Sequence, residues 1–386
     1  MHSTRYFAAY SIDKEFCSGN DVGLFSPGAH ALPWSFSTYL IDLYMRISST
    51  GPVILDVETY ELSVQEREVL LHPQVGGVIF FSRNIDNAKQ VAELTRHIAQ
   101  INPQLLLCVD QEGGRVQRLK NGFTRLPPMG CLGALYTSDA ELACRLAEQL
   151  GWLMASEVLG VGIDLSFAPV LDVDSHYSRV IGDRAFSEVA AHVAALSSAF
   201  VEGMLRAGMH SCGKHFPGHG SVKADSHLEL PADSRPLQAI EERDLIPFRA
   251  LLPKLAAVMP AHIIFSALDH KPVGFSRTWL QDFLRTELAF SGVIISDDLS
   301  MAGAAFAGDY PARAQMALEA GCDGILVCNQ PKHAHAVLDF LEGINNPKTG
   351  RLVALKGQCT LPLAQLQMEK PWDDANELIA RYLSAS

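Results

Sequence analysis

The stretch KHFPGHGSVKADSHLELP, residues 214–231, concentrates histidine, lysine and aspartate in a segment rich in glycine and proline. Asp225 and His227 stand two positions apart, so that in an extended backbone their side chains lie on the same side. A carboxylate that accepts a hydrogen bond from an imidazole fixes the histidine tautomer and raises its basicity. The pair is therefore a candidate general acid/base for catalysis near neutral pH.

Other interpretations of this stretch stay open. The histidine could cap a turn, and the glycines could belong to a loop that grips phosphate. A metal site is a chemical alternative, because imidazole is a common zinc ligand. Its candidate ligands are His210, His215, His219, His227 and His262. Metal sites in barrels generally also take ligands from near the first strand. The segment LDVETY, which ends the first apolar run here, contains no histidine, and this argues against a metal site.

The segment IISDDLSM contains two adjacent carboxylates, Asp297 and Asp298, at the end of an apolar run. Neighbouring side chains at the end of a strand point in opposite directions, so one of the two should face inward and the other outward. We expect Asp297 to face the centre of the fold. Asp298 is a candidate N-cap for a helix that begins within LSMAGAAF.

The segment VDQEGGRVQRL offers groups that suit a polyol ligand. Asp110 can accept hydrogen bonds from neighbouring hydroxyls, and Arg115 and Arg118 provide planar donors. The alternative is an ion pair between aspartate and arginine that braces the turn, which is more plausible for one arginine than for both. Arg184, in SRVIGDRAFS, could equally be an ordinary surface arginine.

Eight short apolar runs alternate with stretches of helical periodicity, such as residues 87–101 and 188–208. The runs are residues 51–57, 76–82, 104–110, 162–170, 209–215, 255–262, 292–297 and 322–328. Strands that are apolar on both faces and alternate with helices are typical of a parallel sheet covered on both sides. The pattern predicts a single-domain α/β protein with a (β/α)8 TIM-type barrel. No G-x-G-x-x-G follows the first run, which disfavours a doubly wound sheet.

Polar residues end most of these runs, and a barrel of this type carries its active site at the carboxyl ends of its strands. The residues are Asp56, Asp110, Asp172, Lys214, His215, His262, Asp297 and Asp298. Each one alone could be a helix cap or a loop charge. Together they predict a polar site at one mouth of the barrel.

Composition narrows the class of partner. The chain has 386 residues, 48% of them hydrophobic, with a net charge of -12. This acidic balance disfavours nucleic acid and anionic membranes as partners, and no segment reaches the length of a transmembrane helix. Eight cysteines without C-x-x-C pairs, several inside apolar runs, predict buried thiols in a reducing compartment, so we expect a cytoplasmic protein. We expect three regions: an N-terminal extension of unknown role (1–50), the barrel (51–345) and C-terminal closing helices (346–386).

The motifs KHFPGHG, DSH, VDQEGGRVQR, IGDRAF and SDDLSM occur here in an order that resembles the β-N-acetylglucosaminidases of glycoside hydrolase family 3, the bacterial enzymes of cell-wall recycling. The resemblance runs from about residue 51 to the C-terminus. It implies that Asp297 is the nucleophile, that His227 is the acid/base and that Asp225 supports it. It also implies sugar contacts from Asp110, Arg118, Arg184, Lys214 and His215. The N-terminal segment and DVDSHYSR depart from the family pattern.

The resemblance implies retaining hydrolysis of terminal β-linked N-acetylglucosamine from anhydro-muropeptides, with no cofactor and no metal. A metal-dependent barrel hydrolase that uses the histidines and a non-catalytic sugar-binding barrel stay as alternatives. A β-glucosidase-like relative is a third, although such enzymes usually carry the acid/base in a second domain. The preference for peptide-bearing substrate, phosphorolysis instead of hydrolysis, and the oligomeric state stay open.

Overall fold

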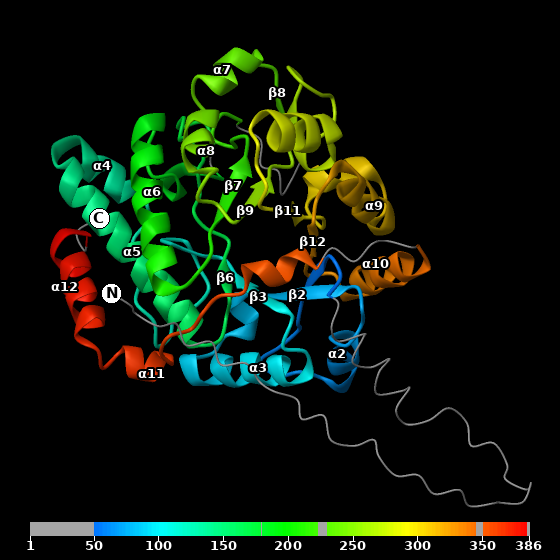
Figure 1. Cartoon of the computed structure of the whole chain (residues 1–386), viewed down its shortest axis with the longest axis horizontal. Helices are drawn as coiled ribbons and strands as arrows, with labels where there is room; N and C mark the ends of the chain where they lie inside the picture. Colours follow the sequence, from blue (N-terminus) through cyan, green and yellow to red (C-terminus); the bar gives the residue numbers. More distant parts are fainter. Residues whose placement is uncertain (1–49, 179, 223–229, 345–349, 384–386) are drawn as a thin grey trace, which may run out of the picture. The chain divides into compact units, whose positions relative to one another are not determined.

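The computed structural model describes residues 50–178, 180–222, 230–344 and 350–383, so Asp225 and His227 lie outside the described residues. Its central sheet has eight parallel strands (Figure 1). They are β1 (Val53–Asp56), β2 (Val75–Phe80), β3 (Leu106–Val109), β6 (Leu165–Ser166), β7 (Cys212–Phe216), β9 (Ala257–Pro260), β11 (Val293–Asp298) and β12 (Gly324–Val327). Each of the eight predicted apolar runs contains one of these strands or overlaps it.

The strands are ordered around the sheet as they are along the chain, and β12 pairs with β1. Residues 168–171, which follow β6, complete the circle against β7. Leu171 donates its N–H to the carbonyl of Lys214 (2.6 Å), and Cys212 donates to the carbonyl of Ala168 (2.8 Å). The sheet therefore closes on itself, which confirms the predicted (β/α)8 fold.

Helices follow the strands and surround the sheet (Figure 1). They are α2 (Val64–Val69), α3 (Ala88–Ile101), α4 (Gly130–Ser138), α5 (Ala140–Gly160), α6 (Ala190–Ala207), α7 (Leu237–Glu241), α8 (Leu245–Leu251), the π-helical η4 (Thr278–Glu287), α9 (Tyr310–Ala320) and α10 (Pro331–Gly343). Among the described residues, no helix combines the length and hydrophobicity needed to cross a lipid bilayer.

Local sequence signals set where several of these helices begin and end. Ser63 and Glu66 form a reciprocal capping box at the start of α2, and each satisfies a backbone N–H that the helix leaves without a partner. Helix α6 ends at Gly208, whose φ of 94° is a left-handed conformation that glycine adopts at little cost. The helical stretch expected over residues 188–208 therefore contains α6.

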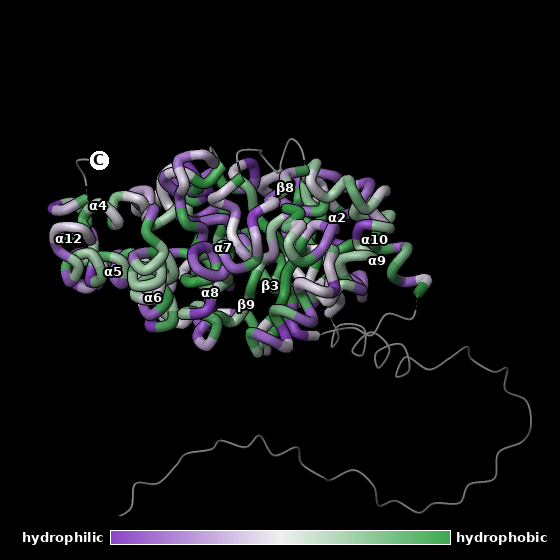
Figure 2. Tube along the Cα trace, turned by 90° about the horizontal axis from the view of Figure 1, so that it is seen from above, coloured by the Kyte–Doolittle hydropathy of each residue, from purple (hydrophilic) through white to green (hydrophobic). Residues whose placement is uncertain are grey.

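Alternation along each strand divides the core into two layers. In β1, Ile54 points into the barrel and joins a buried cluster with Ile79 and Leu106, whereas Val53 and Leu55 join the larger cluster beneath the helices. This is the period of two that a strand imposes on its side chains. Each strand therefore needs apolar residues on both faces, which explains the nearly continuous hydrophobic runs. In Figure 2 the strands are accordingly coloured mostly green, for hydrophobic residues.

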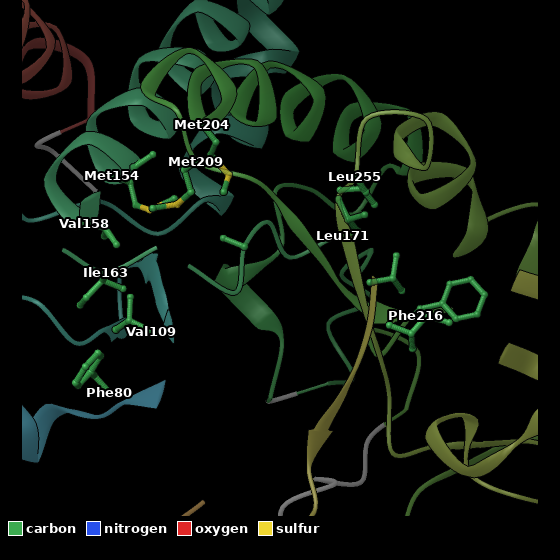
Figure 3. Close-up of a cluster of buried hydrophobic side chains, with 14 of the residues drawn as sticks. Phe80, Val109, Met154, Val158, Ile163, Leu171, Met204, Met209, Phe216 and Leu255 are labelled. Carbon is green, nitrogen blue, oxygen red and sulfur yellow. The ribbon is translucent and has the colours of Figure 1, made fainter. Parts of the chain in front are cut away.

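The outer layer is seen where α5 and α6 cover the sheet. Met154 and Val158 on α5, together with Met204 on α6, lie next to Met209 and Ile163 in Figure 3. All five side chains are almost completely buried. Burial of such side chains stabilises the fold by roughly 1.5–3 kcal/mol each.

The C-terminal residues close the end of the barrel opposite to the mouth. In η6 (Arg351–Leu355), Leu352 and Leu355 belong to the inner cluster, and a side chain at Gly76 or Gly324 would collide with Leu352. Beyond it, α11 (Leu363–Leu366) and α12 (Lys370–Leu383) pack against α5. The proposed boundaries at residues 50 and 345 stay predictions, because residues 1–49 and 345–349 lie outside the described residues.

Short elements occupy the loops that follow the strands at the mouth. They are η1 (Ser82–Asn84), β4 (Gln111–Gly113), β5 (Val116–Gln117), η2 (Gly182–Arg184), β8 (Ala232–Asp233), β10 (Ile264–Phe265), η3 (Val273–Phe275) and η5 (Ala302–Ala307). Strands β4 and β5 form an antiparallel hairpin directly after β3. This hairpin and η2 bring arginines from two different loops to the same side of the molecule.

Candidate active site

A cavity of about 600 Å³ opens at the carboxyl ends of the strands. Its polar lining consists of Asp110, Glu112, Arg115, Arg118, Arg184, Lys214, His215, His219, Asp297, Asp298, Ser300 and Asn329. The six predicted site residues that the structure describes, Asp110, Arg118, Arg184, Lys214, His215 and Asp297, therefore come together. The other two, Asp225 and His227, lie outside the described residues.

Lys214 joins two carboxylates on the floor of this cavity. Its ammonium Nζ lies 3.0 Å from Asp110 Oδ1 and 2.6 Å from Glu112 Oε1. Arg184 makes a bidentate pair with Glu112, in which both N–O distances are 2.8 Å. The side chains of Lys214 and Glu112 are only 4% exposed, so these charges are compensated by one another rather than by water.

The paired charges keep these groups ionised. Burial alone would raise the pKa of Glu112, but Lys214 and Arg184 outweigh it and hold that pKa well below its ordinary range. Burial likewise opposes the charged form of Asp110, whose pKa is nevertheless lowered by Lys214 and Arg118. The two carboxylates outweigh the effect of burial on Lys214 and raise its pKa. The floor of the cavity is thus a fixed set of charges and hydrogen-bonding groups.

Glu112 was not predicted from the sequence. The available signal was its position two residues after Asp110, since this spacing places both side chains on one side of an extended chain. The ligand-facing role expected for Asp110 is also modified, because its Oδ2 lies 3.4 Å from Arg118 Nη2 and its Oδ1 is bound by Lys214. Arg115 pairs with Asp183 (3.5 Å), so both arginines of this hairpin make ion pairs.

His215 is held by a carboxylate beneath the cavity. Its Nδ1 lies 2.7 Å from Oδ2 of Asp172, which is completely buried and also accepts the backbone N–H groups of His215 (3.3 Å) and His219 (2.6 Å). Burial alone would raise the pKa of Asp172, but the two histidines outweigh the effect of burial and lower this pKa. A proton held on Nδ1 leaves Nε2 of a neutral His215 ring as an acceptor. Asp172 therefore orients His215 from below.

Asp297 and Asp298 both line the cavity at the end of β11. Asp298 donates its own N–H to Asp297 Oδ1 (2.8 Å), while its carboxylate accepts N–H groups of Ser300 (2.9 Å) and Cys328 (3.2 Å). The predicted role of Asp298 as the N-cap of the following helix is wrong. The following helix η5 begins after Met301, and Asp298 instead ties the ends of β11 and β12 together.

Burial raises the pKa of Asp298 to about 6. Its pKa in the unfolded chain is about 4, so the protonated carboxyl favours the folded state; this advantage is complete below about pH 4 and is lost as the pH rises through 6. An asparagine in its place would not titrate. The difference in unfolding free energy, parent protein minus Asp298→Asn, should therefore fall by up to roughly 3 kcal/mol as the pH rises from about 4 to 7. Urea denaturation of both proteins across this range measures the difference, which should stay constant if the carboxyl does not titrate there.

Three strand-end residues that were expected at the mouth lie outside the cavity lining. Asp56 pairs with Arg83. Asp172 lies beneath His215. His262 is buried, stacks on Phe275 with ring centroids 5.5 Å apart, and has its Nε2 3.2 Å from the carbonyl oxygen of Asp298. Packing inside the barrel requires some strand ends to be buried, and the sequence pattern does not distinguish these from the exposed ones.

Of the histidines considered as metal ligands, the structure describes His210, His215, His219 and His262. The His215 and His219 rings lie 5.8 Å apart, and burial together with the neighbouring His215 lowers the pKa of His219 to about 4, so its ring is neutral at neutral pH. Within the described ranges, no group of three or more His, Cys, Asp or Glu side chains is placed to hold a metal ion. His227 lies outside those ranges.

Substitution of Glu112 by glutamine should destabilise the fold. It removes the charge that compensates Arg184 and Lys214, and breaking a buried ion pair costs about 3–5 kcal/mol. Urea unfolding measures this loss. The control is Glu141→Gln, which breaks an exposed pair with Arg145 on α5 and should change the unfolding free energy by less than about 1 kcal/mol. Equal losses in the two variants would contradict the account of the cavity floor.

A closed barrel whose strand ends place carboxylates and cations around one cavity defines a barrel enzyme with its site at the usual end of the fold. Residues 52–349 match the glycosyl hydrolase family 3 N-terminal domain. The chain therefore belongs to glycoside hydrolase family 3.

Relatives of known name agree with this assignment. The chain is 54% identical over 308 residues to a beta-hexosaminidase of Tolumonas auensis, covering 79% of this chain and 90% of that protein. It is 51% identical over 308 residues to a beta-hexosaminidase of Pseudomonas aeruginosa, covering 80% and 91%. The crystal structure of NagZ from Neisseria gonorrhoeae in complex with N-trifluoroacetyl-D-glucosamine resembles the present structure with a TM-score of 0.81 and 42% identity, covering 86% of this chain and 98% of that one.

Proposed function

We propose that this protein is a retaining β-N-acetylglucosaminidase that removes terminal β-linked N-acetylglucosamine from peptidoglycan fragments, in particular anhydro-muropeptides. The name beta-hexosaminidase of its relatives and the N-acylated glucosamine bound to the gonococcal NagZ support the sugar specificity. The resemblance to cell-wall recycling enzymes supports the peptidoglycan origin of the substrate. Buried free thiols such as Cys108 and Cys212 support a cytoplasmic location.

The placement of Asp297 carries this proposal. Its carboxylate stands at the tip of β11 in the cavity that also holds Asp110, Lys214 and Arg184. The charged floor provides both acceptors and donors for sugar hydroxyls, held in place by ion pairs before the ligand arrives. Arg118 and His215 at the side of the cavity extend this set of polar contacts. We therefore propose that a pyranose bound on this floor presents its anomeric carbon to Asp297, which lines the same cavity.

The proposed reaction has two steps. Asp297 attacks the anomeric carbon and forms a glycosyl ester, while the bond to the leaving oxygen breaks and His227 gives that oxygen a proton. Water then attacks the anomeric carbon, His227 takes its proton, and Asp297 leaves as a carboxylate. Asp225 stabilises the imidazolium form of His227 by its negative charge.

A substrate panel tests the proposed function. The protein should hydrolyse an aryl β-N-acetylglucosaminide much faster than the corresponding β-glucoside, and NMR of the first product should show the β-anomer. A metal-dependent hydrolase would lose activity with a chelator, and a non-catalytic sugar-binding barrel would have none to lose. An α-anomer as first product would refute the two-step mechanism. Release of acid-labile sugar phosphate in phosphate buffer would reveal phosphorolysis.

A further inference from the structure

Ser221 and Arg235, which precede and follow the acid/base segment (residues 223–229, with Asp225 and His227) along the chain, contact the same buried carboxylate. Before residues 223–229, Ser221 donates its hydroxyl to Asp244 Oδ1 (3.1 Å). After them, Arg235 Nη1 donates to Asp244 Oδ2 (2.8 Å). Asp244 precedes α8 and is completely buried. Its two oxygens thus bind one residue that precedes the acid/base segment in the sequence and one that follows it.

A second arginine reinforces the first of these ends. Arg243 Nη1 lies 2.7 Å from Ser221 Oγ and 3.1 Å from Asp244 Oδ1. Its Nη2 donates to the carbonyl of Asp174 (2.8 Å), in the loop that follows Asp172. The start of the segment is thereby joined to the loop beside His215. Charge-assisted bonds of this kind are stronger and more directional than bonds between neutral groups.

The other end is anchored through a short strand. Arg235 Nε lies 3.0 and 3.1 Å from the two oxygens of Asp233, and its Nη2 lies 2.6 Å from Oδ2. Asp233 belongs to β8, which pairs in parallel with β10 at Phe265. Arg235 therefore connects Asp244 to a strand whose own position is set by backbone pairing.

A simple structural role as a helix cap does not account for Asp244. It occupies the N-cap position of α8, but its side chain makes no capping hydrogen bond. Close packing supports the contact with the segment instead. A Cβ at Gly218 would lie only 2.8 Å from Cβ of Asp244, and the φ of 145° at Gly218 is strained for other residues.

We infer that Asp244, through Ser221, Arg235 and Arg243, is a positioning residue that holds the chain on both sides of the acid/base segment. The inference rests on the proposed role of His227. Fixing both ends of a loop removes many of its conformations before substrate binds. Proton transfer requires the imidazole within about 3 Å of the leaving oxygen, so it depends strongly on where these ends lie.

The test is Asp244→Asn assayed with two aryl β-N-acetylglucosaminides. An unsubstituted phenol is a poor leaving group and needs a proton, whereas dinitrophenolate leaves without one. We expect kcat/KM to fall by roughly 10- to 100-fold for the phenyl substrate, a part of the 10²–10⁴ that acid/base catalysis supplies, and by less than about threefold for the dinitrophenyl substrate. A purely structural defect would lower both values equally, and that result, or no loss on either substrate, overturns the inference.

Two further variants guard against loss of folding. Ser221→Ala removes only one neutral donor from the cluster, and we expect a smaller loss confined to the phenyl substrate. The matched control is Asp323→Asn. Asp323 is also a buried aspartate that binds two arginines, Arg285 (2.7 Å) and Arg351 (3.3 Å), but it precedes β12 at the end of the barrel opposite to the mouth. We expect its loss to reduce thermal stability without any dependence on the leaving group.

The outcomes separate this inference from the proposed function. If His227→Ala shows the leaving-group dependence and neither Asp244→Asn nor Ser221→Ala does, the positioning role is wrong and the function stands. If the parent protein hydrolyses neither substrate, the proposed function itself fails. If His227→Ala affects both substrates equally, the acid/base assignment fails, and the inference that rests on it fails too. Should Asp244→Asn not fold, Ser221→Ala decides, and unchanged kinetics in that variant count against the inference.

Discussion

Asp297→Ala should lower kcat for an aryl β-N-acetylglucosaminide by about 10⁴- to 10⁶-fold, the range that accompanies loss of a nucleophile or of its direct partner. The physical reason is that, among the described residues, the other carboxylates of the cavity are already engaged by neighbouring donors and cannot form the glycosyl ester in its place. Asp298 is adjacent, but its carboxylate is bound by Ser300 and by the backbone of Cys328. Substrate binding should be affected much less, because the charged floor of the cavity remains.

Covalent trapping tests the assignment of Asp297 as the nucleophile independently. A slow fluorinated N-acetylglucosaminide should add one sugar to the parent protein, and peptide mapping should place it on Asp297. Asp297→Ala should remain unlabelled. Asp339→Ala, which changes an exposed carboxylate on α10, should be labelled normally and keep its kcat within about twofold. A sugar attached to any other residue would refute the nucleophile assignment.

His227→Ala should reduce kcat/KM for a phenyl β-N-acetylglucosaminide by about 10²- to 10⁴-fold, the usual contribution of general acid/base catalysis. The loss should be small for a dinitrophenyl substrate in the first step, because that leaving group needs no proton. Hydrolysis of the glycosyl-enzyme should then become limiting, since water is no longer activated. Added azide, a nucleophile that needs no base, should restore turnover and yield the glycosyl azide.

Two histidine variants provide the controls for this experiment. His270→Ala removes an exposed histidine and should leave both substrates unaffected. His219→Ala removes a neutral ring from the cavity wall, and any loss should be the same for the two leaving groups. If His219→Ala rather than His227→Ala shows the leaving-group dependence, the acid/base must be reassigned to His219.

The charged floor suggests why the site can bind a neutral sugar. Lys214 and Arg184 are already compensated by Glu112 and Asp110, so the described lining of the cavity carries no large uncompensated positive charge that would require an anionic ligand. Their remaining N–H groups can still donate to hydroxyls, because ammonium and guanidinium groups have several donors each. The same arrangement avoids the reorganisation that flexible, unpaired side chains would undergo on binding.

The barrel architecture can be predicted from local sequence patterns. Each strand of the barrel is buried on both faces, so its residues must be apolar at successive positions, and this pattern is local enough to be read from runs such as residues 292–297. The polar residues at the ends of these runs predicted the mouth. The family motifs then indicated Asp110, Arg118, Arg184, Lys214, His215 and Asp297, which the structure places around one cavity.

The pairing of those groups depends on contacts that form when the barrel closes. Lys214 meets Asp110 across 104 residues of chain and Arg184 meets Glu112 across 72, and no local pattern encodes such contacts. Closure of the barrel places Glu112 in the floor of the cavity, buries Asp172 beneath His215 and turns Asp298 toward β12. A strand-end side chain faces the cavity or the packed interior according to the register and twist of its neighbours, and these are set by the whole sheet rather than by the residue itself.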